Sequence, residues 1–189
     1  MSKPEGYTLH KLQRMILLHL AENEPQTANE TSLKLSKSYK PTSTAFKTLE
    51  KMNLITETKI KEYRSRRYSE FWLTDEGIVL AILEGVNHEK MSKQAQKLHP
   101  DDKELHLFLD IAPYIDRQII EMTYSSVKES GDIDFMVVLN MLFLQAPTEM
   151  DMDNAQKLST ALKKYPEEYK ILKQAKKFII KQLNQIIPD

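Results

Sequence analysis

The sequence of 189 residues contains no cysteine. This absence excludes disulfides, thiol nucleophiles, iron–sulfur clusters and every zinc site with thiolate ligands, and it fits an intracellular protein. Glycine is scarce, with 4 residues, which leaves little material for a glycine-rich phosphate-binding loop. The chain also lacks paired catalytic carboxylates and the spacing of a Ser-His-Asp triad. We therefore expect a protein that is not an enzyme and that uses no cofactor.

Long apolar runs are missing as well. The longest, Phe135–Leu144, reaches about half of a membrane span and is interrupted by Asn140. The first ten residues, MSKPEGYTLH, lack the apolar segment of a signal peptide. With 41% hydrophobic and 29% charged residues, the composition is typical of a helix-rich globular protein. These features predict a cytoplasmic protein.

The formal net charge is 0, but the charges are unevenly distributed. Residues 1–97 have 16 basic and 12 acidic side chains, whereas residues 98–189 have 11 and 15. The segment from Lys34 to Arg67 is the most basic, with 10 basic side chains against 3 acidic ones. This asymmetry favours an N-terminal part that meets a polyanion. A solvated, lysine-rich surface is the alternative that charge alone leaves open.

Capping and turn residues divide the first hundred residues into short elements. Thr27 and Glu30 form the T-x-x-E pattern of a capping box, and Pro41 suits the first turn of a helix. Two segments rich in β-branched or aromatic residues, joined by the basic sequence KEYRSRR, predict a hairpin. The predicted elements are a helix capped by Thr8 that ends before Pro25, a second helix from Thr27, a third from Pro41 to Met52, strands Leu54–Ile60 and Tyr68–Leu73, and a helix over Asp75–Glu84.

The rest of the chain is predicted to be helical, with proline and glycine residues as breaks. Pro113 lies inside the longest predicted helix and should kink or break it. The helix around Phe135–Leu144 is apolar nearly all round, which fits a core, a dimer seam or the wall of a ligand pocket. The predicted helices are one within Asn87–Leu98, one from Asp101 to about Ser126, one over Asp132–Gln145, one from Met150 to Lys164 and one from Pro166 to Ile187.

Three helices, a basic hairpin and a further helix follow one another in the order of a winged helix-turn-helix domain. The sequences PTSTAFKTLEKMNLI (Pro41–Ile55) and FWLTDEG (Phe71–Gly77) resemble the recognition helix and the last wing strand of regulators of the PadR and MarR families. The resemblance covers residues 8–86. It implies a DNA-binding transcription regulator whose helical C-terminal region forms a dimer.

We therefore predict a mainly α fold in three parts. Residues 1–86 form a winged-helix DNA-binding domain, residues 87–100 a linker or short helix, and residues 101–189 an all-helical dimerisation or regulatory domain. The expected partners are double-stranded DNA, a second copy of the chain bound through the C-terminal helices, and a small-molecule or protein effector.

DNA recognition requires short polar and basic side chains on the outer face of the third helix. Ala45, Leu49 and Met52 are expected to form its buried face, and the wing over residues 59–68 is expected to contact the backbone or the minor groove. The predicted DNA-binding residues are Thr42, Ser43, Thr44, Lys47, Lys51, Lys59, Lys61, Arg64, Arg66 and Arg67.

Each of these features has a plainer interpretation. The threonine-rich helix start also suits the cap of an ordinary surface helix, and the basic wing suits a hairpin that uses lysine and arginine against edge-strand association. Winged helices also serve as protein-docking modules of the transcription or chromosome machinery; this is the alternative function.

Two groups of residues have features of metal sites. The first group is His99, Asp102, His106 and Asp110, and Pro100 is expected to place His99 outside the helix that carries the others. The second group is Glu149, Asp151 and Asp153, which lacks the glycine and terminal glutamate of a calcium loop. We expect neither group to bind a metal.

Overall fold

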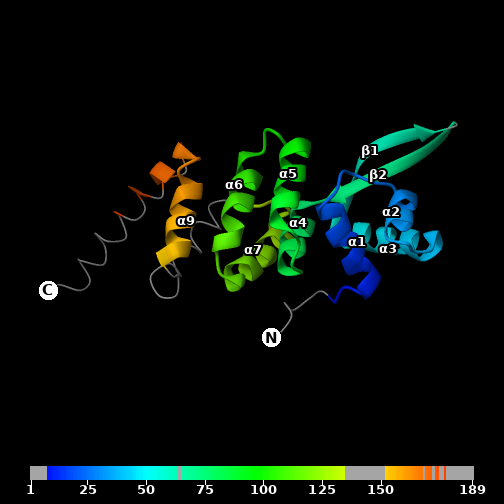
Figure 1. The fold of residues 1–189 in the computed structure, drawn as a ribbon, viewed down its shortest axis with the longest axis horizontal. Helices are drawn as coiled ribbons and strands as arrows, with labels where there is room; N and C mark the ends of the chain where they lie inside the picture. The colour runs from blue at the N-terminus through cyan, green and yellow to red at the C-terminus, as the bar shows by residue number, and fades with distance from the viewer. Residues whose placement is uncertain are drawn as a thin grey trace.

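The computed structural model describes residues 8–63, 65–134, 152–167, 169–171, 173, 174 and 177. The molecule extends along one axis, with a β-hairpin at one end and helices at the other (Figure 1). This order confirms the predicted mainly α fold, a winged helix followed by a helical region. The elements are α1 (Lys11–Ala21), α2 (Ala28–Lys34), α3 (Tyr39–Lys51), β1 (Ile55–Tyr63), β2 (Arg66–Leu73), α4 (Asp75–Leu83), α5 (His88–Leu98), α6 (Lys103–Ile111), the 3-10 helix η1 (Ala112–Tyr114), α7 (Arg117–Ser130) and α9 (Met152–Leu162).

The predicted capping box at the start of α2 is confirmed. The Thr27 hydroxyl accepts the backbone N–H of Glu30 at 3.2 Å, and Glu30 Oε2 accepts the backbone N–H of Thr27 at 2.9 Å. Two backbone donors that the helix itself leaves unpaired are thereby satisfied. The cap fixes where α2 begins.

The other two helices of the helix-turn-helix begin at positions that differ from the prediction. The cap of α1 is His10 rather than Thr8, and Gln13 Oε1 accepts the His10 backbone N–H at 2.8 Å. Helix α3 begins at Tyr39, so Pro41 is its third residue. Proline still fits there because the first-turn amides have no partner within the helix.

The wing is a tight antiparallel hairpin. Strands β1 and β2 pair from Ile55 opposite Leu73 to Tyr63 opposite Arg66. The ladder therefore includes most of the sequence KEYRSRR (residues 61–67), which was expected to connect the two strands. An isolated backbone bridge joins Gln26 to Phe71 of β2. Lys59 and Lys61 therefore lie on a paired strand, which fixes the positions of their backbones.

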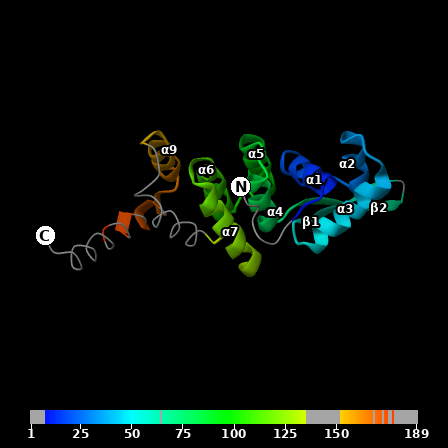
Figure 2. The ribbon, with the colours of Figure 1, turned by 90° about the horizontal axis from the view of Figure 1, so that it is seen from below.

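One hydrophobic core continues from the winged helix into the helical region. Helix α4 joins the two parts, because its residues from Glu76 to Leu83 are all buried and it contacts both α1 and α7 (Figure 2). Met91 and Ala95 of α5 belong to the same core. The division of the chain near residues 86–100 stays a prediction.

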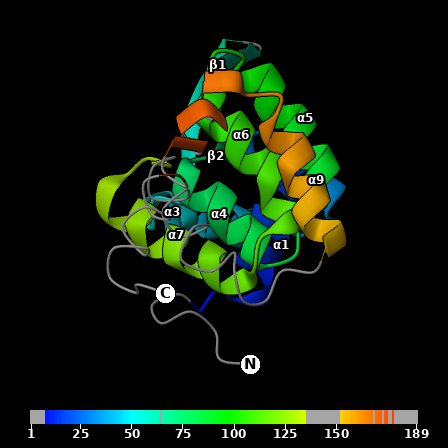
Figure 3. The ribbon, with the colours of Figure 1, turned by 90° about the vertical axis from the view of Figure 1, so that its left-hand side faces the viewer.

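The helical region follows the predicted breaks. Pro113 lies in η1, between α6 and α7, so the long predicted helix is broken there. Helices α6 and α9 lie side by side in the view along the long axis (Figure 3). In the predicted helix over 132–145, residues 132–134 are not helical and the remainder, with its apolar stripe, lies outside the described residues. No helix of the described part of the chain is long and apolar enough to cross a bilayer.

Candidate nucleic-acid interface

The outer face of α3 is positively charged. Helical spacing places Lys40, Thr44, Lys47 and Lys51 on the side of α3 opposite its buried residues, and all four side chains are exposed. No described residue forms an ion pair with any of these three lysines. At 1.5 Å of rise per residue they extend over about 16 Å of helix. The face therefore offers uncompensated positive charge along most of α3.

Short polar side chains accompany these lysines. Thr44 is exposed between Lys40 and Lys47, and its hydroxyl donates to the Lys40 carbonyl at 3.1 Å. Ser43 is half-buried at the edge of the same face. Because both side chains are short, a partner could approach the helix backbone closely here.

The prediction that Thr42 faces outward is wrong. Its side chain is 0% exposed, and its hydroxyl donates to the Ser38 carbonyl at 2.9 Å. Phe46 was not among the residues expected on the buried face, yet it is buried and packs edge-on against Phe71 of the wing, with ring centroids 5.6 Å apart. Since Thr42 lies one helical turn before Phe46, it points into the domain with it.

The cations of the wing lie in different electrostatic surroundings. Lys59 is exposed and has no ion pair with a described residue. Lys61 Nζ lies 2.8 Å from Glu30 Oε1, and Arg67 Nε lies 3.0 Å from Glu62 Oε1. Arg64 and the side chain of Arg66 lie outside the described part of the chain. Lys59 is thus the uncompensated cation of the described wing.

The ion pair between Lys61 and Glu30 is reinforced by hydrogen bonds. Burial disfavours the ionised form of Glu30, but the hydrogen bonds from Lys61 and Thr27 outweigh it and lower the pKa of Glu30. The hydrogen bond to Glu30, with a second one to Glu70, raises the pKa of Lys61. Both groups are therefore ionised at neutral pH, and the positive charge of Lys61 is partly neutralised.

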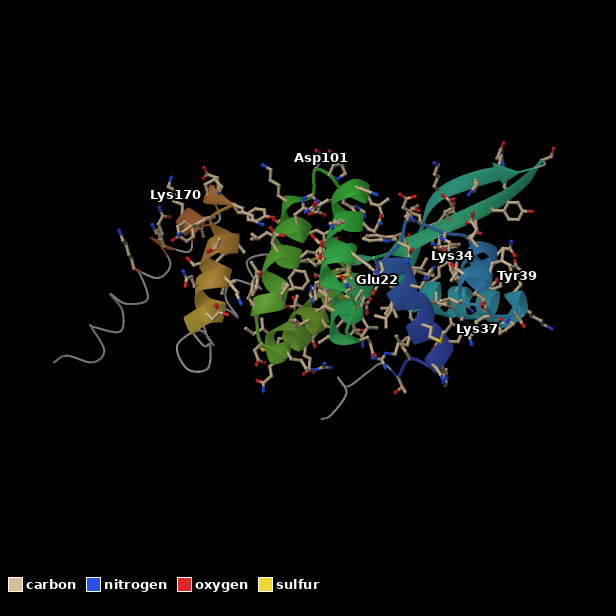
Figure 4. All side chains as sticks on the ribbon, viewed as in Figure 1. Glu22, Lys34, Lys37, Tyr39, Asp101 and Lys170 are labelled. Carbon is tan, nitrogen blue, oxygen red and sulfur yellow. The ribbon has the colours of Figure 1, made fainter. Side chains whose placement is uncertain are left out.

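The sequence did not predict a group of exposed residues at the end of α2, in the turn that follows it and at the start of α3. Leu33 is 71% exposed and Tyr39 is 56% exposed, and Lys34 and Lys37 are exposed beside them. Figure 4 shows Lys34, Lys37 and Tyr39 at the end of the molecule opposite Lys170. The basic composition of the segment could have indicated the two lysines. Nothing in the local sequence marks Leu33 as exposed, because apolar residues at helical spacing usually face a core.

Three residues of the first candidate metal group, His99, Asp102 and Asp110, contact other parts of the protein. Asp102 caps α6 by accepting the Leu105 backbone N–H at 2.9 Å, and Asp110 accepts a hydrogen bond from Lys164 at 2.9 Å. The ring of His99 lies against Trp72, with centroids 5.6 Å apart. Within the described ranges, no three histidine or carboxylate side chains are placed to hold a metal ion.

The acidic run near residue 150 is described only in part. Asp153 forms an ion pair with Lys157 one turn later on α9, as is typical of a solvated helix surface. Glu149 and Asp151 lie outside the described residues. The structure therefore describes a surface ion pair at Asp153.

Comparison with known proteins finds similarity among solved structures. No family model and no curated protein matches the chain. The crystal structure of ZitR, a zinc-responsive MarR family member of Lactococcus lactis, is 22% identical, covers 70% of this chain and 83% of its own, and has a TM-score of 0.38. Wild-type ZitR in complex with DNA is 23% identical, with coverages of 70% and 82% and a TM-score of 0.36.

With TM-scores of 0.38 and 0.36, this similarity carries no conclusion about the family or the role of the chain. Membership in a particular family of regulators stays a prediction. The binding properties named for ZitR are those of ZitR. The function of the present chain has to follow from the placement of its own residues.

Proposed function

We propose that the chain is a sequence-specific DNA-binding transcription regulator. The observation that supports this most directly is the outer face of α3, where Lys40, Lys47 and Lys51 are exposed without an ion-pair partner among the described residues. An α helix fits the major groove, and a row of lysines on its outer side meets the phosphates that border the groove. Ser43 and Thr44 are short enough to approach base edges between them.

In this proposal the residues have two roles. Ser43, Thr44 and Lys47 lie toward the base edges, whereas Lys51 and the wing residues Lys59, Lys61, Arg64, Arg66 and Arg67 contact the backbone or enter the minor groove. Contacts with the DNA backbone position the protein and add affinity for every duplex, because phosphates are the same in every sequence. Thr42 contributes through the stability of α3.

The number of uncompensated lysines sets the expected strength of the salt dependence. Besides Lys47, which lies toward the base edges in this proposal, five lysines around α3 and the wing have no ion pair with a described residue: Lys34, Lys37, Lys40, Lys51 and Lys59. If each contacted a phosphate, the logarithm of affinity would fall against the logarithm of salt concentration with a slope of about −4.5 per protomer. That slope means a loss of about 500-fold in affinity between about 50 and 200 mM salt.

We further propose that the protein acts as a homodimer through its C-terminal helices. Two copies would place two α3 helices about 34 Å apart, in successive major grooves of a pseudo-palindromic site. Residues 1–86 then form the DNA-binding part and residues 101–189 the dimerisation or regulatory part, which an effector would address. Sedimentation of the full chain tests this proposal, and a monomer at every concentration would contradict the palindromic arrangement.

One observation favours a second candidate function. Leu33, near the end of α2, and Tyr39, at the start of α3, expose apolar surface, and exposed apolar surface is typical of protein docking. A titration of full-length protein with a labelled duplex of arbitrary sequence, at about 50 and about 200 mM salt, separates the two functions. Binding that is strong at low salt and falls steeply supports the regulator. Absence of binding at low salt contradicts it and favours the docking module.

A further inference from the structure

The first turn of α4 contains a buried carboxylate between the recognition helix and the helical region. Glu76 is 3% exposed. One of its oxygens faces Asn53, in the turn that ends α3, and the other faces Tyr124 of α7. The three residues are far apart in the sequence, so the fold alone brings them together.

The turn after α3 is held firmly on the start of α4. Asn53 Nδ2 donates to Glu76 Oε2 at 3.3 Å, and the Thr74 hydroxyl donates to the Asn53 carbonyl. The Thr74 backbone N–H donates to the Leu54 carbonyl at 3.3 Å. A Cβ atom at Gly77 would lie 1.9 Å from the same carbonyl oxygen, which shows how closely the two backbones approach. A shift of α4 must therefore move the end of α3.

The start of α4 is also tied to the helical region. Tyr124 is 2% exposed, and its hydroxyl donates to Glu76 Oε1 at 3.3 Å. Asp75 Oδ2 accepts the backbone N–H of Ile133, beyond the end of α7, at 2.9 Å. Glu76 thus accepts hydrogen bonds from both sides through its two oxygens.

We propose that Glu76 is a positioning residue that couples α7 to the DNA-binding face of α3. The inference rests on the proposed function, because it concerns how that face is regulated. A buried carboxylate depends on its donors, since the loss of one donor weakens the hydrogen bonding that offsets its lost hydration. A change in α7, caused by dimerisation or by an effector, therefore alters the hydrogen bonds that hold Asn53. The two sites are coupled energetically through one shared side chain.

The test is a double-mutant cycle in the full chain, with DNA affinity as the measured quantity. Tyr124→Phe removes only the hydroxyl. Asn53→Gly removes the amide and keeps a backbone that tolerates the φ of 57° at this position. The two residues share Glu76 as a hydrogen-bond partner, so their effects on affinity should deviate from additivity by about five-fold. In a Glu76→Met background the same two changes should be additive.

Tyr165→Phe is the matched control. Tyr165 also donates its hydroxyl to a carboxylate at 3.3 Å, but that carboxylate is Asp110 of α6. Tyr165→Phe should leave the DNA affinity within about two-fold of wild type, since its carboxylate partner Asp110 pairs with Lys164 in the helical region and distant sites act independently. Additive effects of Tyr124→Phe and Asn53→Gly, or equal losses from Tyr124→Phe and Tyr165→Phe, would overturn the proposal.

Hydrogen exchange tests the coupling without DNA. The backbone N–H groups of Asn53 and Leu54 donate to the Glu50 and Leu49 carbonyls, each at 2.9 Å, so their exchange reports the opening of this turn. Tyr124→Phe should accelerate their exchange about five-fold or more, and Tyr165→Phe should not. Unchanged exchange in Tyr124→Phe overturns the inference. If the wild type bound no DNA while this acceleration occurred, the proposed function would fail and the coupling would stand.

Discussion

Lys61 Nζ lies 2.8 Å from Glu30 Oε1, and the other oxygen of this carboxylate caps α2 by accepting the Thr27 backbone N–H. A lysine of the wing is thereby bound to the helix-turn-helix. Lys59, two residues earlier on the same strand, has no such partner among the described residues. The two lysines form a matched pair for measuring how an internal ion pair affects DNA binding.

Lys59→Ala should reduce the salt dependence of DNA binding more than Lys61→Ala. A free lysine that contacts a phosphate adds about 0.9 to the magnitude of the slope, whereas Lys61 already neutralises Glu30 and has less charge to offer. The measurement is the affinity for one duplex over a series of salt concentrations. Equal slopes for the two variants would show that the ion pair does not survive in the complex.

Substitutions on opposite faces of α3 should separate recognition from stability. Thr44→Ala and Lys47→Ala should each cost about 1–3 kcal/mol against the preferred site and far less against random duplex. Thr42→Ala should instead cost about 1–2 kcal/mol of folding free energy, because it removes a buried hydroxyl that donates to Ser38. Its preference among DNA sequences should be unchanged. Loss of sequence preference in Thr42→Ala would contradict the orientation of the helix.

Two leucines near the recognition helix should differ sharply in their effect on folding. Leu49 is 0% exposed in the core, and Leu49→Ala should lower the free energy of unfolding by about 2–5 kcal/mol. Leu33 is 71% exposed, so Leu33→Ala should change the free energy of unfolding by no more than about 0.5 kcal/mol. Chemical denaturation measures both, and a large loss in Leu33→Ala would show that this side chain is covered in solution.

Asp75 should make folding stability depend on pH. Burial raises the pKa of Asp75 above its ordinary value, although the Ile133 N–H favours the ionised form. The folded state therefore binds this proton more tightly than the unfolded state does. The stability that the group contributes is complete below the unfolded pKa of about 3.9 and is lost as pH rises through the folded value.

Asp75→Asn removes this ionisation and so provides the measurement. The free energy of unfolding of Asp75→Asn minus that of wild type should increase as pH rises from about 4 to about 7. Denaturation curves at several pH values give this difference. A difference that stays constant or decreases would mean that ionised Asp75 is well solvated or well paired in the folded state.

Local signals in the sequence were sufficient for most of the fold. The capping box of Thr27 and Glu30 marks the start of α2, and Pro113 marks the break between α6 and α7, because both act through their immediate neighbours. The hairpin follows from β-branched and aromatic residues, although its ladder extends further than composition suggests. These features depend on residues within a few positions of one another.

The arrangement of the candidate interface depends on contacts that no local pattern contains. The polar side chain of Thr42 predicts an outward position, but Phe46 packs on the wing and this packing orients α3 so that Thr42 is buried. The partner of Lys61 is 31 residues away in the sequence. The hydroxyl donor of Glu76 is 48 residues away. Such pairings arise only when the helices and the wing have packed together.

The most direct test compares two double variants that lose the same charge, one on α3 and one in the helical region. Lys40→Ala with Lys51→Ala removes two exposed cations from the outer face of α3. Lys103→Ala with Lys170→Ala removes two exposed cations from the helical region. The measured quantity is the slope of the logarithm of DNA affinity against the logarithm of salt concentration. We expect the first pair to reduce the magnitude of this slope by about 1.8 per protomer and the second to leave it unchanged. Equal slopes for the two pairs would contradict the claim that α3 faces the DNA.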